Sequence, residues 1–167
     1  MNSIPHASPG SQFEAPASWP VILIRLMVGI VFLSEGIQKF LYPAELAAGR
    51  FAKIGIPWPE VMGPFVGVAE IVCGVLILMG LFTRLAAAVM LINITVALLS
   101  TKLPILLGQA VGPFSLPKLP RYGLWGSLHE ARADLCMWLG CAFLIAVGGG
   151  SLSLGARRGV ARKSVEP

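Results

Sequence analysis

Charged residues are scarce in this chain. Asp, Glu, Lys and Arg make up 13% of its 167 residues, whereas 56% of the residues are hydrophobic. A soluble domain usually carries about 25% charged residues, so the composition excludes an ordinary soluble domain and indicates a membrane protein with several spans. The net charge of +5 does not indicate a nucleic-acid partner, because the basic excess lies largely in a C-terminal segment that suits a membrane flank, at Arg157, Arg158, Arg162 and Lys163.

Cysteine is also rare, and the spacing of the cysteines does not suit dithiol redox chemistry. None of the three cysteines, Cys73, Cys136 and Cys141, forms a C-x-x-C pair. Cys136 and Cys141 lie about 140° apart around a helix and cannot bridge within it. A dithiol enzyme is therefore disfavoured, and buried cysteines that act as small apolar residues are favoured.

Histidine is too scarce for a convincing metal site. Of the two histidines, His6 lies near the N-terminus, so His129 would have to bind an ion with Glu130 and Asp134 alone. No metal is expected from this set. The chain also lacks a phosphate loop, a nucleophile elbow and a dinucleotide fingerprint. The sequence therefore carries none of the commonest motifs of soluble enzymes.

The stretch 25–40, RLMVGIVFLSEGIQKF, is apolar enough to cross a bilayer and yet carries three charged residues. A helix turns about 100° per residue, so position determines the face on which a side chain lies. The small, aromatic and charged residues share an arc of about 120°, and they are Arg25, Gly29, Phe32, Glu35, Gly36 and Lys39. The opposite face is Leu, Ile, Val and Met, so we expect lipid on that side and other helices on the charged side.

Four apolar segments predict an all-α fold, a transmembrane four-helix bundle with a long loop between helices three and four. Pro104 is expected to end the third helix, and the fourth is expected to open with the HEARAD run at 129–134 and to end at Gly148 to Gly150. The expected helices cover residues 20–41, 60–82, 85–102 and 128–147.

This domain, residues 20–150, is expected to lie between two tails. The segment 1–19 is rich in Ser, Pro and Ala and predicts a disordered N-terminal tail, and 151–167 is a basic C-terminal tail. Four spans place both termini on one side of the membrane, and the basic tail favours the cytoplasmic side.

The sequence also makes predictions for two of the segments that connect the helices. Residues 44–53 predict a short amphipathic helix at the interface, and Trp58 is expected to be an interfacial anchor. The connection 103–128 is long enough for a lid or a docking surface, with a plain surface linker as the alternative.

Small residues predict where helices approach one another. Gly63 and Gly67 form a G-x-x-x-G motif, and Glu70 continues the same stripe. Asn93 is expected to make an interhelical hydrogen bond rather than to bind a ligand. The glycines expected at helix contacts are Gly29, Gly36, Gly63, Gly67 and Gly74.

The ionisable residues of the spans are expected to converge in one half of the bundle, because the end of helix one and the starts of helices two and four lie on one side. Glu35 and Lys39 have the four-residue spacing and order of a favourable ion pair. Glu70, at mid-depth, is expected to be paired with a basic residue or protonated near neutral pH. The candidate cluster is Glu35, Lys39, Glu70, His129, Glu130, Arg132 and Asp134.

Two interpretations of this cluster stay open. It is either a buried ionic network that fixes helix packing, or a polar pocket for a small molecule, a proton or a quinone headgroup.

Four motifs in order resemble the DoxX family, and together they cover about residues 20–154. The first span resembles its R-x3-G-x2-F-x3-G-x2-K opening, beginning at Arg25. Glu70, Gly74 and the run 80–86, GLFTRLA, resemble its second signature. The segments 101–105, TKLPI, and 129–134, HEARAD, are similar to a subgroup of the family. The chain departs from the S-L-D ending of many members, since its 151–154 segment is SLSL.

The resemblance implies a multi-pass protein of the bacterial inner membrane. Relatives include a subunit associated with thiosulfate oxidation and quinone reduction, and members that join membrane oxidoreductases. The resemblance itself implies little about activity. The function expected from it together with the polar cluster is an accessory or quinone-facing subunit of a membrane oxidoreductase system, with no stand-alone enzymatic activity. The lipid bilayer and oxidoreductase subunits are the expected partners, and quinone is the candidate cofactor. The alternatives are a small permease or proton-coupled transporter, which needs a path to both sides, and a structural membrane scaffold.

Overall fold

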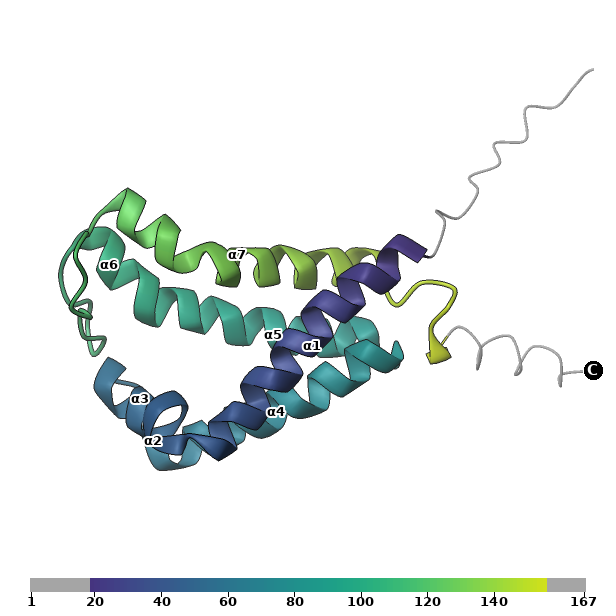
Figure 1. Cartoon of the computed structure of the whole chain (residues 1–167), viewed down its shortest axis with the longest axis horizontal. Coiled ribbons are helices and arrows are strands. Elements are labelled where there is room, and N and C mark those ends of the chain that lie inside the picture. The colour runs from purple at the N-terminus through teal and green to yellow at the C-terminus, as the bar shows by residue number, and fades with distance from the viewer. Residues whose placement is uncertain (1–18, 156–167) are drawn as a thin grey trace, which may run out of the picture.

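The computed structural model describes residues 19–155, which form an all-helical protein (Figure 1). The all-α fold expected from the sequence is confirmed, and the described residues form no β-sheet beyond one isolated bridge between Val111 and Phe114. Four long helices carry the fold: α1 (Trp19–Leu41), α4 (Pro59–Met79), α5 (Thr83–Ala97) and α7 (Leu124–Val147). The shorter ones are α2 (Pro43–Leu46), α3 (Ala48–Ile54), the π-helical turn η1 (Leu98–Lys102) and α6 (Leu103–Leu107).

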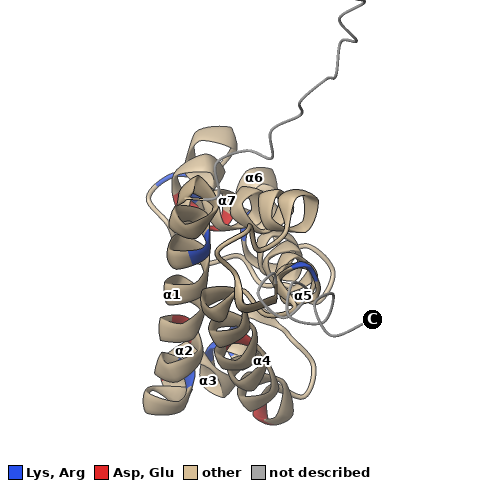
Figure 2. Ribbon diagram, turned by 90° about the vertical axis from the view of Figure 1, so that its right-hand side faces the viewer, with Lys and Arg blue, Asp and Glu red and all other residues tan. Residues whose placement is uncertain are grey.

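Among residues 19–155, three segments are long and apolar enough to cross a membrane: Trp19–Leu41, Pro59–Met79 and Thr83–Leu107. Helix α7 has 24 residues but concentrates its charged residues, Glu130 to Asp134, in its N-terminal half. The residues that follow these charges, 135–147, are apolar. Figure 2 shows how few positions along the long helices carry charge. The expected tails lie outside the described residues, except for Trp19 and the segment 151–155.

Pro104 does not end the third helix, contrary to expectation. The helical path continues to Leu107 through η1, where the Leu103 N–H bonds to the Leu98 carbonyl five residues earlier. This wider turn places Pro104 at the start of α6, where a missing N–H is tolerated. The hydroxyl of Thr101 donates to the Ala97 carbonyl at 2.6 Å and stabilises the same turn.

Two other helix boundaries differ from the prediction. Helix α7 begins at Leu124, one turn before the expected start, because Gly123 adopts a φ of 85° and its carbonyl accepts the Ser127 N–H at 2.9 Å. The segment expected as one amphipathic helix is divided into α2 and α3 by a break at Ala47.

Helices α1 and α4 pack closely through glycines. A Cβ atom added to Gly36 would lie 2.7 Å from the Gly67 carbonyl oxygen, and one added to Gly74 would lie 2.8 Å from the Leu33 nitrogen. Only glycine allows backbones this near to each other. Gly29 faces Leu78 of α4, whereas Gly63 faces Ala47 and Ala48, at the start of α3, rather than another long helix.

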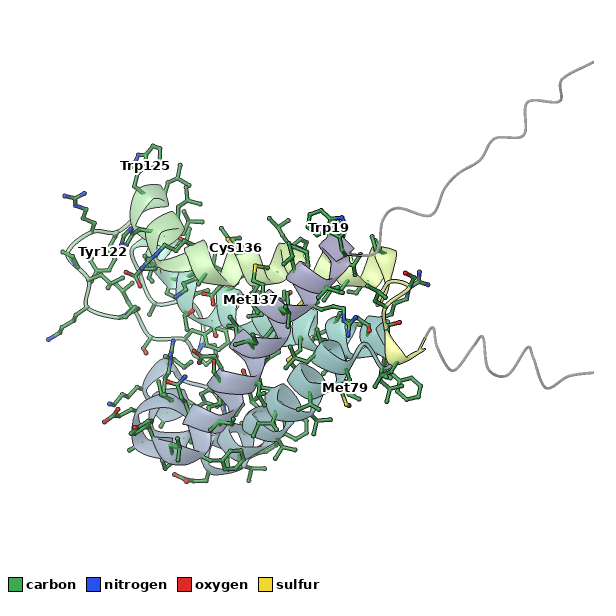
Figure 3. All side chains as sticks on the ribbon, turned by 45° about the vertical axis from the view of Figure 1, so that its right-hand side comes forward. Trp19, Met79, Tyr122, Trp125, Cys136 and Met137 are labelled. Atoms are coloured by element: carbon green, nitrogen blue, oxygen red, sulfur yellow. The ribbon has the colours of Figure 1, made fainter. Side chains whose placement is uncertain are left out.

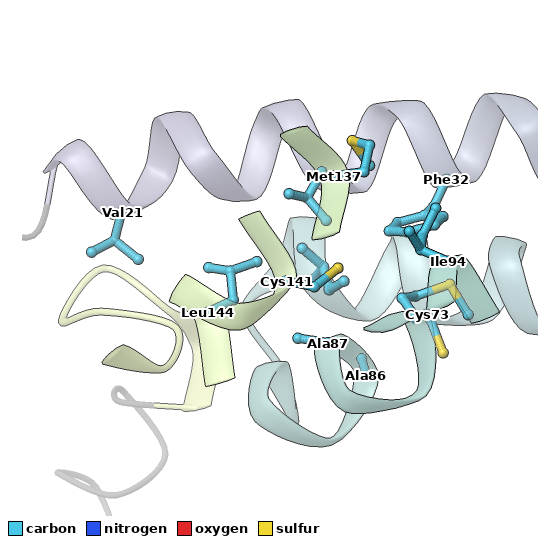
Figure 4. Packing of buried hydrophobic residues seen from close by; sticks show 12 residues of the cluster. Val21, Phe32, Cys73, Ala86, Ala87, Ile94, Met137, Cys141 and Leu144 are labelled. Atoms are coloured by element: carbon cyan, nitrogen blue, oxygen red, sulfur yellow. The ribbon is translucent and has the colours of Figure 1, made fainter. Parts of the chain in front are cut away.

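The hydrophobic core lies where both helix pairs, α1–α4 and α5–α7, come together (Figure 4). Val28, Ile77, Met90, Cys141 and Leu144 are fully buried there. The α1–α4 and α5–α7 pairs diverge toward the end that carries α2, α3 and α6 (Figure 1). The divergence leaves the space in which the site lies.

The connection between α6 and α7 joins the two diverging pairs. Ser115 donates its N–H to the Ile54 carbonyl at 3.3 Å and its hydroxyl to the Lys53 carbonyl, both at the end of α3. The connection therefore reaches across to α3 at this end of the molecule. Figure 3 shows Tyr122 and Trp125 at this end and Trp19 at the opposite end, as in membrane proteins with aromatic residues at both interfaces.

Candidate functional site

Four side chains form a polar array between the diverging helix pairs: Glu35 and Lys39 of α1, Glu70 of α4 and Asn93 of α5. The Lys39 ammonium lies 2.6 Å from Glu70 Oε2, and Asn93 Nδ2 donates to Glu70 Oε1 at 3.0 Å. Both carboxylate oxygens of Glu70 are thus occupied. Lys39 and Glu70 are buried, with 9% and 6% of their side chains exposed. The array therefore places a hydrogen-bonded ion pair inside the helical assembly.

Glu35 completes the array at its outer edge. One of its carboxylate oxygens lies 3.8 Å from Lys39 Nζ, and 48% of its side chain is exposed. Lys39 thus faces two carboxylates, one buried and directly bonded and the other accessible. The two acidic side chains are consequently not equivalent.

A cavity of about 330 Å³ lies beside the array. All four residues of the array line it, and its other walls are mainly apolar. Phe32, Ile94 and Met137 line the cavity and also belong to the hydrophobic core. Phe51 and Ile54 of α3 line the same space. The site thus combines apolar walls with a small number of polar groups, which is typical of ligand-binding pockets.

The other residues of the predicted cluster lie in different places in the structure. Asp134 lines the cavity, and its carboxylate lies 3.5 Å from the ammonium of Lys102. His129 and Glu130 line a separate pocket beside Trp125. Arg132 is exposed, lies in neither pocket and donates a hydrogen bond to the His129 carbonyl. Only Glu35, Lys39, Glu70 and Asp134 of the seven candidates meet at one cavity.

Three polar residues in or next to the site were not among the candidates. Asn93 makes the interhelical hydrogen bond expected of it, but its partner is Glu70. The position of Asn93 inside an apolar segment was the sequence feature that could have identified it as a site residue. Arg50 lines the cavity from α3, and Lys102 pairs with Asp134. No local pattern in the sequence connects these two residues to helices distant in the chain.

The opposite end of the bundle has a different polar feature. Arg25 donates to the carbonyls of Ile77 at 2.9 Å, Leu78 at 2.6 Å and Gly149 at 3.1 Å. The first two belong to the last turn of α4, where a cation is favoured by the helix dipole and by unpaired carbonyls. Arg25 therefore joins α4 to the chain after α7, far from the cavity.

The cavity can hold a small amphipathic ligand. Lys39 and Asn93 each have an N–H beyond those given to Glu70, and Glu35 can accept a hydrogen bond. The charged groups that line the space are the carboxylates of Glu35, Glu70 and Asp134 and the cations of Lys39 and Arg50. Donors and acceptors are thus both available beside an apolar surface.

Comparison with known proteins identifies the family. The DoxX family model matches residues 21–103. A Mycobacterium tuberculosis protein described as an uncharacterised membrane protein is 48% identical over 154 residues, which cover 86% of this chain and 90% of that protein. CatD of Bacillus subtilis, whose name proposes an oxidoreductase, is 30% identical over 82 residues, or 49% of this chain and 59% of CatD. No solved structure gives a significant match. On these matches, the chain belongs to the DoxX family and is a membrane protein.

Proposed function

We propose that this protein is a quinone-facing accessory subunit of a membrane oxidoreductase system and that the cavity beside Glu70 receives the quinone headgroup. The observation that carries the proposal is a buried Lys39–Glu70–Asn93 array beside an apolar cavity in membrane-spanning helices. Intramembrane ionisable residues are costly and commonly mark functional sites. The proposed setting is the bacterial inner membrane, with both termini in the cytoplasm.

The cavity fits such a headgroup in size and in chemistry. Its volume of about 330 Å³ is at the lower end of the roughly 300–1,000 Å³ range of small-molecule sites. Phe32, Phe51 and Met137 offer apolar and aromatic surface for the ring of a quinone. A carbonyl oxygen of the ring can accept a hydrogen bond from Lys39 or Asn93.

The residues of this chain would bind and orient the quinone rather than reduce it. Glu70 holds Lys39 and Asn93 in place through its two carboxylate oxygens, so their remaining N–H groups have fixed positions. A quinone supplies two-electron chemistry when it is bound. In this proposal the electrons come from, or go to, a partner oxidoreductase, and this chain provides the lipid-side pocket. The oxidoreductase name of CatD agrees with this setting.

A permease is less well supported. Permeation needs a path that joins the cavity to the opposite side of the membrane. The cavity ends instead at Phe32 and Met137, and the fully buried Val28, Ile77 and Leu144 follow in the core. At the far end of the bundle, the Arg25 guanidinium donates hydrogen bonds to three backbone carbonyls. The packing of this half therefore opposes a continuous polar path.

Mass spectrometry of the gently purified, tagged protein tests the proposal, with both co-purifying proteins and extracted lipids measured. We expect oxidoreductase subunits and a stoichiometric quinone with the wild type. Glu70→Gln should lose the quinone but still accumulate in the membrane, and the matched control Glu60→Gln should retain it, because Glu60 is exposed and outside the cavity. A wild-type protein that carries only bulk lipid would contradict the proposal. Loss of membrane accumulation in Glu70→Gln alone would support a structural scaffold.

A further inference from the structure

We infer that Glu35 is the ligand-facing group of the cavity, that it makes the site prefer a hydroquinone to the corresponding quinone, and that the ligand enters from the bilayer between α1 and α7. This inference rests on the proposed function and specifies the redox form that the site selects. It follows from the different surroundings of the two glutamates in the polar array.

Glu70 is much less accessible to a ligand than Glu35. Lys39 and Asn93 occupy the two carboxylate oxygens of Glu70, and the side chain is almost fully buried. Among the described residues, Glu35 has no polar contact closer than 3.8 Å, to Lys39. Nearly half of its side chain is exposed, and it lines the cavity. A ligand in the cavity therefore meets the Glu35 carboxylate before it meets Glu70.

The position of Glu35 along α1 makes this exposure unusual. Glu35 lies six positions before the end of the helix at Leu41, which corresponds to about 9 Å along the helix axis. A carboxylate at this depth is costly unless it is paired or hydrogen-bonded. Lys39 is mainly committed to Glu70, which it contacts at a distance 1.2 Å shorter (3.8 Å against 2.6 Å). A hydrogen-bond donor on the ligand would satisfy the oxygens of Glu35.

A carboxylate at Glu35 favours binding of the hydroquinone over the quinone. An ionised carboxylate only accepts hydrogen bonds, and a quinone carbonyl also only accepts, so the two repel each other. A hydroquinone hydroxyl can donate to Glu35 and accept from Lys39 at the same time. The other charged groups that line the cavity, Arg50, Glu70 and Asp134, do not change this difference: Glu70 and Asp134 have cationic partners, and Arg50 can donate to either form.

Exposed lining residues on α1 and α7 indicate the route of entry. Val31 and Glu35 of α1 and Ala133 of α7 line the cavity and are exposed. Farther along, α1 and α7 meet closely at Gly140, where an added Cβ would lie 2.6 Å from the Val28 side chain. The boundary between α1 and α7 is therefore closed at Gly140, but beside the cavity it is lined by accessible residues. A lipid-soluble ligand can reach Glu35 from the acyl-chain region beside the cavity.

Binding of dimethylnaphthoquinone and of its hydroquinone tests the selection. The full-length protein in lipid nanodiscs is equilibrated with each form under anaerobic conditions, and the dissociation constant is measured by equilibrium dialysis. The wild type should bind the hydroquinone roughly tenfold more tightly, which is the size expected for one hydrogen bond to a charged group. Glu35→Gln adds an N–H donor, so hydroquinone affinity should fall, quinone affinity should rise, and the preference should disappear.

Two further variants separate the possible failures. The exposed Glu60→Gln should leave both affinities unchanged, and Glu70→Gln should weaken both forms because it disturbs Lys39 and Asn93 together. Binding of neither form by the wild type would overturn the proposed function. Equal binding of both forms, or an unchanged preference in Glu35→Gln, would overturn the inference and leave the proposed function standing.

The route is tested by tryptophan substitutions at the cavity edge. Val31→Trp should slow or prevent binding of the hydroquinone, whereas Ile30→Trp, on the exposed face of the same helix and outside the cavity, should not. Val96 is an exposed lining residue on the α5 side. Inhibition by Val96→Trp without inhibition by Val31→Trp would place the entry between α4 and α5 and overturn the proposed route.

Discussion

Replacing Lys39 by methionine should reveal how strongly the buried ion pair supports the fold. The substitution leaves Glu70 with 6% of its side chain exposed and without the ammonium that lies 2.6 Å from its carboxylate. Breaking a buried pair by removing one partner typically costs about 3–5 kcal/mol, because the remaining charge is buried without compensation. We expect a loss of this size in the free energy of unfolding. The measurement is an unfolding titration in mixed micelles followed by circular dichroism.

A double variant tests the reason for that loss. Lys39→Met combined with Glu70→Leu removes both charges, and replacing a buried pair by apolar residues is often neutral or stabilising. The double variant should therefore be more stable than Lys39→Met alone by about 3 kcal/mol, and it should no longer bind dimethylnaphthoquinone. The surface control Glu60→Gln should stay within about 0.5 kcal/mol of the wild type. Additive losses from the two substitutions, or a loss below about 1 kcal/mol for Lys39→Met, would refute this reasoning.

The remaining predictions concern packing, the distant end, the long connection and orientation. Gly36→Ala should destabilise the protein by about 1–3 kcal/mol and more than Gly29→Ala in the same titration, because a new Cβ at Gly36 meets a backbone carbonyl at 2.7 Å and at Gly29 first meets a side chain. Arg25→Met should cost roughly 3 kcal/mol through loss of its carbonyl contacts but leave the affinity for dimethylnaphthoquinone unchanged. Ser115→Ala should cost about 1 kcal/mol and speed amide hydrogen exchange in residues 108–123, since it loses the hydroxyl bond to the Lys53 carbonyl of α3. A C-terminal green fluorescent protein should fluoresce and a C-terminal alkaline phosphatase should be inactive in a bacterial host if the termini are cytoplasmic, and the reverse result would contradict that orientation.

The long helices could be predicted from the sequence because apolar length and periodicity determine them locally. The boundaries depended on finer features of the backbone. Pro104 normally indicates a helix end, but the π-helical turn before it allows the helical path to continue to Leu107. Gly123 starts α7 one turn early through a positive φ. Such turns depend on how the chain packs around them, which the local pattern does not contain.

The polar array was predictable in part for the same reason. Glu35 and Lys39 share a helical face, so their proximity follows from their spacing. The rotation of α7 could not be read in this way. Its buried residues, including Met137 and Cys141, turn Asp134 toward the cavity and leave Arg132 exposed on another face. Tertiary packing, rather than the sequence pattern of α7, selects which polar face joins the site.

Photoaffinity labelling with an azidoquinone, followed by peptide mapping, tests the central claim most directly. The quinone site predicts cross-links in the segments of α1, α4, α5 and α7 that line the cavity, around Glu35, Glu70, Asn93 and Asp134. Unlabelled dimethylnaphthoquinone should compete for these cross-links, and Glu70→Gln should reduce them. Cross-links spread over the exposed apolar faces, without competition and unaffected by Glu70→Gln, would show that quinone meets this protein only as bulk lipid and would contradict the account.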